Sequence, residues 1–354
     1  NAYMLRGSDA KRGYMRWWHS FQGICPTTQE TRTFFVEYSI LNPALGTSQP
    51  ILGQHPYYKR HGLKPSYLCI KAGVFPEPGD SGLQLQAYYP LTSLQVAQDP
   101  FYMQFEDCVY SENRISGSID ISDEVARHRS LMTDAGSFIW DLEVHKAVAC
   151  HTGYIANAFF TAVHALESFW HGEGIRTFFR GTVILNGVTY EVTPETSYGY
   201  ADKHWGRSYN QPWLQFASGH LISEKTGREL KLFFPMRRRI LMQLTYTGED
   251  FEYHFGRPLT LSRCKWKVKE TNKRFIWHFK AQNRTSVVRI SGSCSKEQMM
   301  PLLYESPDGK VSDIPLWEGG NATGTIELYR RIGGSLELID RLQFENGLCA
   351  YQRS

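Results

Sequence analysis

Residues 138–145, Phe-Ile-Trp-Asp-Leu-Glu-Val-His, carry the pattern that decides the fold class. Phe138, Trp140, Leu142 and Val144 recur at every second position, and such side chains share one face of a strand. The period of two therefore predicts a β-strand with one apolar face. The same alternation predicts further strands at 33–40, 83–89, 115–121, 176–185, 188–192, 213–222, 228–234, 239–246, 264–268, 275–281, 287–292, 324–331 and 335–344.

Two glycine-containing turns indicate antiparallel pairing. Asn186-Gly187 separates two alternating runs, and this dipeptide favours a two-residue β-hairpin. Gly333-Gly334 predicts a second hairpin of the same kind. Many short strands with turn residues between them are typical of sandwiches and barrels. The sequence therefore predicts an all-β protein made of antiparallel barrels or sandwiches.

One segment departs from the strand pattern. Within 154–168, apolar residues recur at helical spacing in an alanine-rich run, which predicts a single amphipathic helix. Residues 42–66 hold four prolines and several glycines, and we expect a long loop there. The helix would be an insertion in an otherwise β-structured chain.

Length and an internal repeat indicate two related halves. A chain of 354 residues can form two domains of ordinary size. Arg114-Ile-Ser-Gly-Ser118 recurs as Arg289-Ile-Ser-Gly-Ser293, about half a chain later. We therefore divide the chain near residue 195, into a β domain at 1–195 with the helical insertion and a second β domain at 196–354.

Composition excludes several classes of protein. The net charge of +4 is too weak to predict a nucleic-acid binder. No run of 18 apolar residues is present, so no transmembrane helix is expected. The seven cysteines are scattered without metal-binding spacing, which favours a reducing, cytoplasmic compartment. Contact with a membrane surface remains open, and the sequence does not predict an oligomeric state.

Residues 199–206, Gly-Tyr-Ala-Asp-Lys-His-Trp-Gly, concentrate the candidate chemistry. An acid, a base and an imidazole stand among large aromatic residues, between two glycines that permit unusual turns. We expect a functional loop, since loops often carry catalytic residues. The alternative is the end of a strand, with an Asp202–Lys203 salt bridge covered by a packed tryptophan.

Polar residues on the predicted strands provide further candidates. Glu143 and His145 share the second face of the strand at 138–145, which is either functional or simply exposed. Glu37 lies among aromatic residues and is either solvated or lines a cavity. A metal site built from Glu143, His145 and His204 is conceivable, but no close-spaced ligand pair lies on one element, so we expect no metal.

The span from Phe138 to Leu221 resembles the tocopherol cyclase family. The matching motifs are Glu143-Val-His145, Gly181-Thr-Val-Ile-Leu-Asn-Gly187, Gly199-Tyr-Ala-Asp-Lys-His-Trp-Gly206 and Pro212-Trp-Leu-Gln215. They cover about a quarter of the chain. Two features depart from the family pattern, namely the predicted helix at 154–168 and a histidine at 204, where Asp or Asn is expected.

The resemblance implies two lipocalin-like β-barrels and a cofactor-free ring closure of a prenylated hydroquinone. In that reaction an acid protonates an alkene of the tail, and the phenolic oxygen captures the resulting cation. The acid must be held neutral near neutral pH, as a carboxyl in an apolar pocket is. Asp202 is the first candidate and Glu143 the second, while His145 or Tyr200 would accept the phenol proton.

The aromatic residues supply the predicted substrate site. Trp17, Trp205 and Trp213 would stabilise the cation through their ring faces. Trp18, Lys203 and His204 complete the predicted set of substrate-binding residues. The partner is therefore a hydrophobic small molecule. The alternative function is a non-catalytic, lipocalin-type carrier whose aromatic residues only hold such a ligand.

Overall fold

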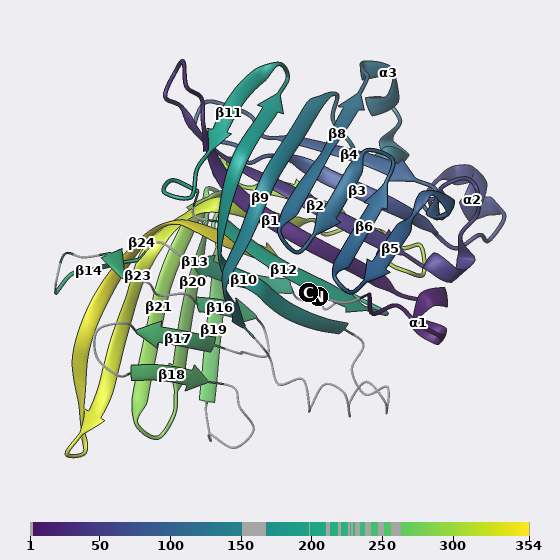
Figure 1. The fold of residues 1–354 in the computed structure, drawn as a ribbon. Coiled ribbons are helices and arrows are strands. Elements are labelled where there is room, and N and C mark those ends of the chain that lie inside the picture. The colour runs from purple at the N-terminus through teal and green to yellow at the C-terminus, as the bar shows by residue number, and fades with distance from the viewer. Residues whose placement is uncertain are drawn as a thin grey trace. The chain divides into compact units, whose positions relative to one another are not determined.

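The computed structural model describes residues 3–150, 168–197, 199–209, 213–218, 221–225, 227, 229–230, 234–237, 242–246, 251–255 and 263–353. Its regular structure is almost entirely antiparallel β, which confirms the all-β prediction (Figure 1). The helix predicted at 154–168 lies outside the described residues, apart from Ser168, which begins a strand. No helix in the described part of the chain is long and apolar enough to cross a bilayer.

The chain forms two compact units. Unit 1 comprises Asn1–Phe75, Gly82–Asn210 and Leu303–Pro315, and unit 2 comprises Pro76–Ser81, Gln211–Leu302 and Leu316–Ser354. Each unit therefore includes a short segment from the opposite half of the chain. The strand at 199–206 follows the boundary expected near residue 195 and belongs to unit 1, because both strands that it pairs with lie there.

Unit 1 contains a twelve-stranded antiparallel sheet. Its order is β4-β3-β2-β1-β11-β10-β9-β8-β7-β6-β5, and β12 pairs with both β1 and β10. The sheet curls into a barrel, so that β4 returns beside β8 and β9. The strands are β1 (Tyr14–Ile24), β2 (Thr31–Leu41), β3 (Tyr67–Val74), β4 (Leu83–Tyr89), β5 (Gln95–Gln98), β6 (Phe101–Phe105), β7 (Cys108–Ser111), β8 (Arg114–Ile121), β9 (Gly136–Cys150), β10 (Ser168–Leu185), β11 (Val188–Val192) and β12 (Gly199–Gly206).

Short helical turns connect these strands. The loop expected at 42–66 contains the 3-10 turn η1 (Pro43–Leu45) and the helix α2 (Pro56–Arg60). The other turns of unit 1 are α1 (Ser8–Lys11), η2 (Leu91–Ser93), α3 (Asp123–Ala126) and η3 (Arg129–Leu131). Asn186 and Gly187 have φ angles of 48° and 82°, so the predicted hairpin between β10 and β11 is confirmed.

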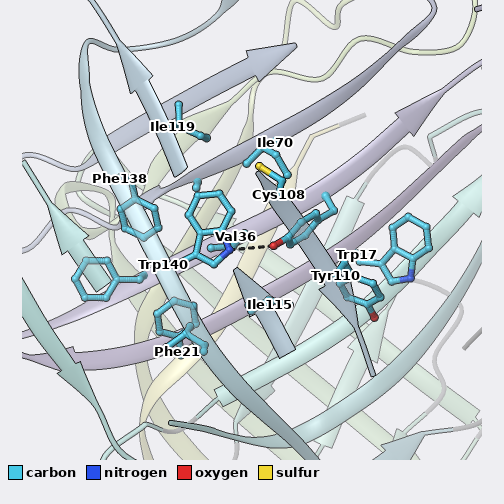
Figure 2. Close-up of a cluster of buried hydrophobic side chains, with 14 of the residues drawn as sticks. Trp17, Phe21, Val36, Ile70, Cys108, Tyr110, Ile115, Ile119, Phe138 and Trp140 are labelled. Atoms are coloured by element: carbon cyan, nitrogen blue, oxygen red, sulfur yellow. Dashed lines mark hydrogen bonds between the residues drawn. The ribbon is translucent and has the colours of Figure 1, made fainter. Parts of the chain in front are cut away.

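The core of unit 1 follows the predicted alternation. Trp140 and its neighbours at every second position of β9 are buried, as are the matching residues of β2. Figure 2 shows Trp140 in this cluster, where its indole N–H donates to the Tyr38 hydroxyl at 2.9 Å. That hydroxyl in turn donates to the carbonyl of Val109 at 2.8 Å. The hydrogen bonds satisfy the polar atoms of two large aromatic residues inside an apolar core.

Unit 2 contains a ten-stranded antiparallel sheet and a separate two-stranded ladder among its described residues. Phe216, Trp277 and Phe344 form the centre of its core, and Gly292 lies so close that a Cβ there would be 2.5 Å from the Phe216 ring. The strands are β13 (Trp213–Ser218), β14 (Leu221–Ser223), β15 (Glu229–Leu230), β16 (Phe234–Arg237), β19 (Arg263–Glu270), β20 (Arg274–Gln282), β21 (Ser286–Ser295), β22 (Met300–Leu302), β23 (Leu316–Ile332) and β24 (Ser335–Gln352), with η4 (Lys296–Gln298), and the ladder is β17 (Met242–Tyr246) with β18 (Phe251–Phe255).

Candidate functional site

The segment expected to be a functional loop is the strand β12. It lies between β1 and β10 and pairs with both, and all its residues are buried. Successive side chains of a strand point to opposite faces. Tyr200, Asp202 and His204 therefore lie on one face, and Lys203 and Trp205 lie on the other. The strand separates the predicted site residues into two groups.

The first group centres on the Asp202 carboxylate. Its Oδ2 atom accepts hydrogen bonds from the Trp170 indole at 2.9 Å and the Tyr200 hydroxyl at 2.8 Å. The His204 ring nitrogen Nε2 lies 3.1 Å from the same oxygen. Asp202 and His204 are each only 1% exposed. The ionic partner of Asp202 is thus His204, and not Lys203 as the strand-end interpretation supposed.

The ionisation of Asp202 differs from the expected one. Burial raises the pKa of its carboxyl, but the charge of His204 and the hydrogen bonds from His204, Trp170 and Tyr200 lower it by more. The pKa of Asp202 consequently lies below its ordinary value. The expectation of a raised pKa is wrong, because a carboxylate that accepts several hydrogen bonds is stabilised in its charged form.

The second group lies inside unit 1. The Lys203 ammonium is 5.5 Å from the ring centroid of Trp17 and 5.3 Å from that of Trp205. Both indoles therefore lie within cation–π distance of the same ammonium, that of Lys203. Burial lowers the pKa of Lys203 to about 8, while the charge of Glu173 opposes that shift.

Glu173 belongs to a buried charged cluster that the sequence analysis missed. Its Oε2 atom accepts from the Lys146 ammonium at 2.6 Å and the Tyr110 hydroxyl at 2.8 Å. Burial raises the pKa of Glu173, but Lys146 lowers it to a net value below the ordinary one. The His19 ring lies in a tilted contact with the Tyr110 ring, with centroids 5.5 Å apart, and burial lowers the pKa of His19 to about 3. In the sequence, Glu173 stands between two glycines and shows no sign of this role.

The remaining predicted residues do not join either group. Glu143 and His145 are exposed on the outer face of β9, as the alternative interpretation of that strand proposed. Trp18 lies on the face of β1 opposite Trp17 and stacks on the Phe35 ring, with centroids 5.1 Å apart. The Trp213 side chain lies outside the described side chains. No three His, Cys, Asp or Glu residues in the described ranges are grouped to hold a metal ion.

A small polar cavity lies on the outer side of β1, β2 and β3. Its volume is about 20 Å³, and a water molecule needs roughly 10–15 Å³. Glu37 is 1% exposed and lines it, which confirms the cavity interpretation of this residue. Four tyrosines and three charged residues contribute to the lining, namely Tyr14, Tyr67, Tyr209, Tyr304, Glu37, Lys71 and Glu305.

The segment 303–315 closes one side of this cavity. Tyr304 donates its hydroxyl to Glu37 Oε2 at 3.2 Å, and the Arg16 guanidinium binds the same oxygen at 3.2 Å. The Lys71 ammonium lies 3.4 Å from the Tyr304 ring centroid. The amide of Asn42 donates to the carbonyl of Pro307 at 2.8 Å. These contacts hold the segment against the sheet of unit 1.

Glu305 has the protonation behaviour that the sequence analysis assigned to Asp202. It is 3% exposed, and its Oε1 atom accepts a hydrogen bond from the backbone N–H of Gln54 at 2.7 Å. Burial raises the pKa of Glu305 to about 7, and the hydrogen bond from Gln54 opposes that shift only partly. No sequence pattern around residue 305 indicates this, because the residues that bury Glu305 come from distant parts of the chain.

Comparisons with known proteins find solved structures that resemble this fold but share little sequence with this chain. No protein-family model and no curated protein matches the sequence. A crystal structure of a Nitrosomonas europaea protein that bears the name AttH has a TM-score of 0.43 and 11% identity, covering 98% of this chain and 97% of that chain. Kievitone hydratase from Nectria haematococca has a TM-score of 0.40 and 11% identity, covering 98% and 90%. CghA with Sch210972 has a TM-score of 0.41 and 9% identity, covering 97% and 89%. Likeness at this level says nothing about the activity of this chain.

Proposed function

We propose that this chain is an enzyme that protonates an alkene of an apolar substrate and so starts ring closure or addition of water. Glu305 would be the proton donor. The observation that supports the proposal is its carboxyl group, which is buried, lines a cavity and has its pKa raised to about 7, so that a protonated fraction persists near neutral pH. An acid that is neutral near the working pH is what alkene protonation needs.

The residues beside Glu305 suit a phenolic substrate. Lys71 lines the same cavity, and a nearby cation favours the ionised form of a phenol. The phenol oxygen is the nucleophile in ring closure, and a nearby cation eases the loss of its proton as the new C–O bond forms. Tyr67, Tyr209 and Tyr304 line the same cavity, which has room for about one water molecule, so an aromatic head group would contact their rings only after the cavity widens. We therefore propose a prenylated hydroquinone as the substrate class, in keeping with the resemblance of β9 to β13 to the tocopherol cyclases.

Both reactions begin with the same proton transfer and differ in the group that captures the cation. In ring closure the phenolic oxygen forms the new C–O bond and releases its proton. In hydration a water molecule forms that bond and then returns a proton to the carboxylate, and the cavity is large enough for one water. Neither reaction changes the oxidation state of the substrate, so the proposal invokes no cofactor.

The other predicted site residues keep their proposed roles with one exception. Tyr200 remains a candidate acceptor of the phenol proton, whereas Trp17 and Trp205 lie inside unit 1 and would act only on a substrate bound there. Glu143 and His145 would act only on a substrate bound outside the sheet. Asp202 is no longer a candidate proton donor, because its low pKa keeps it ionised.

Turnover of a geranylgeranylated hydroquinone, followed by mass spectrometry, tests the proposal. The wild type should yield a cyclised or hydrated product, and Glu305→Gln should remove turnover while ligand uptake, followed by tryptophan fluorescence, survives. Asp313→Asn is the matched control, since Asp313 is an exposed carboxyl on the same segment. Equal turnover in Glu305→Gln and the wild type would refute the assignment of the proton donor.

A carrier is the second candidate function. The aromatic interior of unit 1, with Lys203 within cation–π distance of both Trp17 and Trp205, favours it, because that arrangement can hold a ligand without reacting with it. Uptake of the prenylated hydroquinone by the wild type, with no product from any such substrate, would support the carrier and overturn the enzyme.

A further inference from the structure

A row of charged residues crosses five strands on the exposed face of the unit 2 sheet. The register places Lys265 opposite Lys280, and Lys280 opposite Arg289. The row continues with Glu327 on β23 and Arg341 on β24. Four of the five residues in this row are therefore cations. Like charges directly opposite each other destabilise a sheet. The row therefore lowers the stability of unit 2, and packing within unit 2 gives no reason for its presence.

Further lysines extend this positive face along β19. Lys267 and Lys269 follow Lys265 at every second position, and all three are exposed. In the described part of the chain, none of these lysines and no atom of Lys280 forms an ion pair, whereas Glu327 pairs with Arg341 at 3.0 Å. Lysines on an edge strand are explained by a simpler role, since they prevent the edge from pairing with the sheet of another molecule. That explanation does not cover Lys280, which lies on the inner strand β20.

Aliphatic side chains stand at one end of the same face. The β23–β24 hairpin, yellow in Figure 1, ends in residues 331–338, all of which are exposed. Leu336 and Leu338 are 38% and 48% exposed. They pair with Arg331 and Tyr329. The Tyr329 hydroxyl donates to Glu327 at 2.7 Å, which places these leucines on the side of the charged row.

The neighbouring turn adds positive charge at the hairpin tip. Arg331 donates its backbone N–H to the carbonyl of Thr285 at 2.8 Å, so the tip is joined to the turn between β20 and β21. Arg284 in that turn is exposed. The end of the sheet thus combines exposed leucines with exposed arginines.

We propose that unit 2 docks on an anionic lipid bilayer through this surface, with Leu336 and Leu338 in the headgroup region and the basic row against the lipid charge. Anionic lipids attract clusters of Lys and Arg, and aliphatic side chains gain free energy when they leave water for the acyl boundary. The phosphates of a nucleic acid would pair with the lysines, but a nucleic acid would not bury the leucine side chains in an apolar phase. The surface would bring the enzyme to the phase in which an apolar substrate dissolves.

Vesicle flotation tests this proposal without any substrate, so its outcome is independent of the proposed activity. The protein should float with phosphatidylcholine–phosphatidylserine vesicles and remain behind with phosphatidylcholine alone. Each lysine replaced at the surface should weaken partitioning about fivefold, because a basic residue near an anionic surface contributes roughly 1 kcal/mol. Lys265→Gln and Lys280→Gln are suitable variants, and Leu336→Ser with Leu338→Ser tests the aliphatic tip.

Matched controls come from exposed residues of unit 1. Lys59→Gln and Ile139→Ser alter the same residue types and should float as the wild type does. Absence of wild-type flotation with anionic vesicles would overturn the proposal, and so would equal losses in the control variants. Tighter binding of an oligonucleotide, lost in the same lysine variants and displacing the vesicles, would assign the face to nucleic acid instead.

Discussion

Replacing Glu305 by glutamine should stabilise the protein near pH 8 and change its stability little near pH 5. Burial raises the pKa of Glu305 from 4.5 to about 7. A carboxyl whose pKa is raised by folding contributes stability that is present below its unfolded pKa and is lost as the pH rises to the folded pKa. A shift of about 2.5 pKa units corresponds to roughly 3 kcal/mol. Glutamine does not ionise, so the variant should avoid this loss.

The exchange preserves the local contacts. Glutamine keeps an oxygen that can accept the Gln54 N–H, and its amide replaces the oxygen on the Tyr67 side of the carboxyl. The volume changes little, so cavity terms do not obscure the electrostatic effect. The free energy of unfolding of Glu305→Gln should exceed that of the wild type by about 3 kcal/mol near pH 8, but by only about 1 kcal/mol near pH 5.

Urea unfolding at both pH values, followed by tryptophan fluorescence, measures the difference. Glu37→Gln is the control, because Glu37 forms a buried ion pair with Arg16 at 3.2 Å. Breaking such a pair should cost about 3–5 kcal/mol at either pH. If Glu305→Gln is less stable than the wild type near pH 8, or gains equally at both pH values, the carboxyl is not held neutral and the assignment of the proton donor fails.

Two further substitutions are expected to destabilise unit 1, and the same unfolding measurement checks them. Asp202→Asn should cost about 3–5 kcal/mol, since it removes the buried carboxylate that Trp170, Tyr200 and His204 surround. Asp141→Asn removes an exposed ion pair and should cost at most about 1 kcal/mol, so equal losses would contradict the burial argument. Tyr38→Phe should cost about 1–3 kcal/mol, because the Trp140 indole N–H then lacks its acceptor inside the core. No loss in Tyr38→Phe would show that this hydrogen bond contributes nothing.

The strands of this fold could be predicted because their alternation reflects a sheet with one buried face. Residues 138–144 show it plainly, and the Asn186-Gly187 turn followed from the positive φ angles that it permits. Strand lengths were less predictable. β23 begins at Leu316, well before the predicted start at 324, through a stretch that contains Gly319, Gly320 and Asn321. Pairing with β22 and β24 overrides the weak strand propensity of that stretch.

The arrangement within β12 was predictable only in part. Its residue types indicated chemistry, but their density of charge suggested a loop, because buried charges are costly. The strand can bury them because β10 supplies partners, namely Glu173 for Lys203 on one face and Trp170 for Asp202 on the other. Once β12 is known to be a strand, the separation of Asp202 from Lys203 follows from the period of two.

The proton donor could not be predicted, because burial alone does not determine whether a carboxyl ionises. Asp202 and Glu305 are both almost completely buried, yet their pKa values move in opposite directions. Asp202 accepts hydrogen bonds from Trp170 and Tyr200 and lies beside the His204 imidazole, whereas Glu305 accepts a hydrogen bond from the neutral backbone N–H of Gln54. The pKa of Glu173 is lowered, like that of Asp202, because the Lys146 ammonium lies 2.6 Å from its carboxylate. Cations and donors near a carboxyl are set by tertiary contacts, so a sequence can indicate that an acid is buried but not whether it keeps its proton.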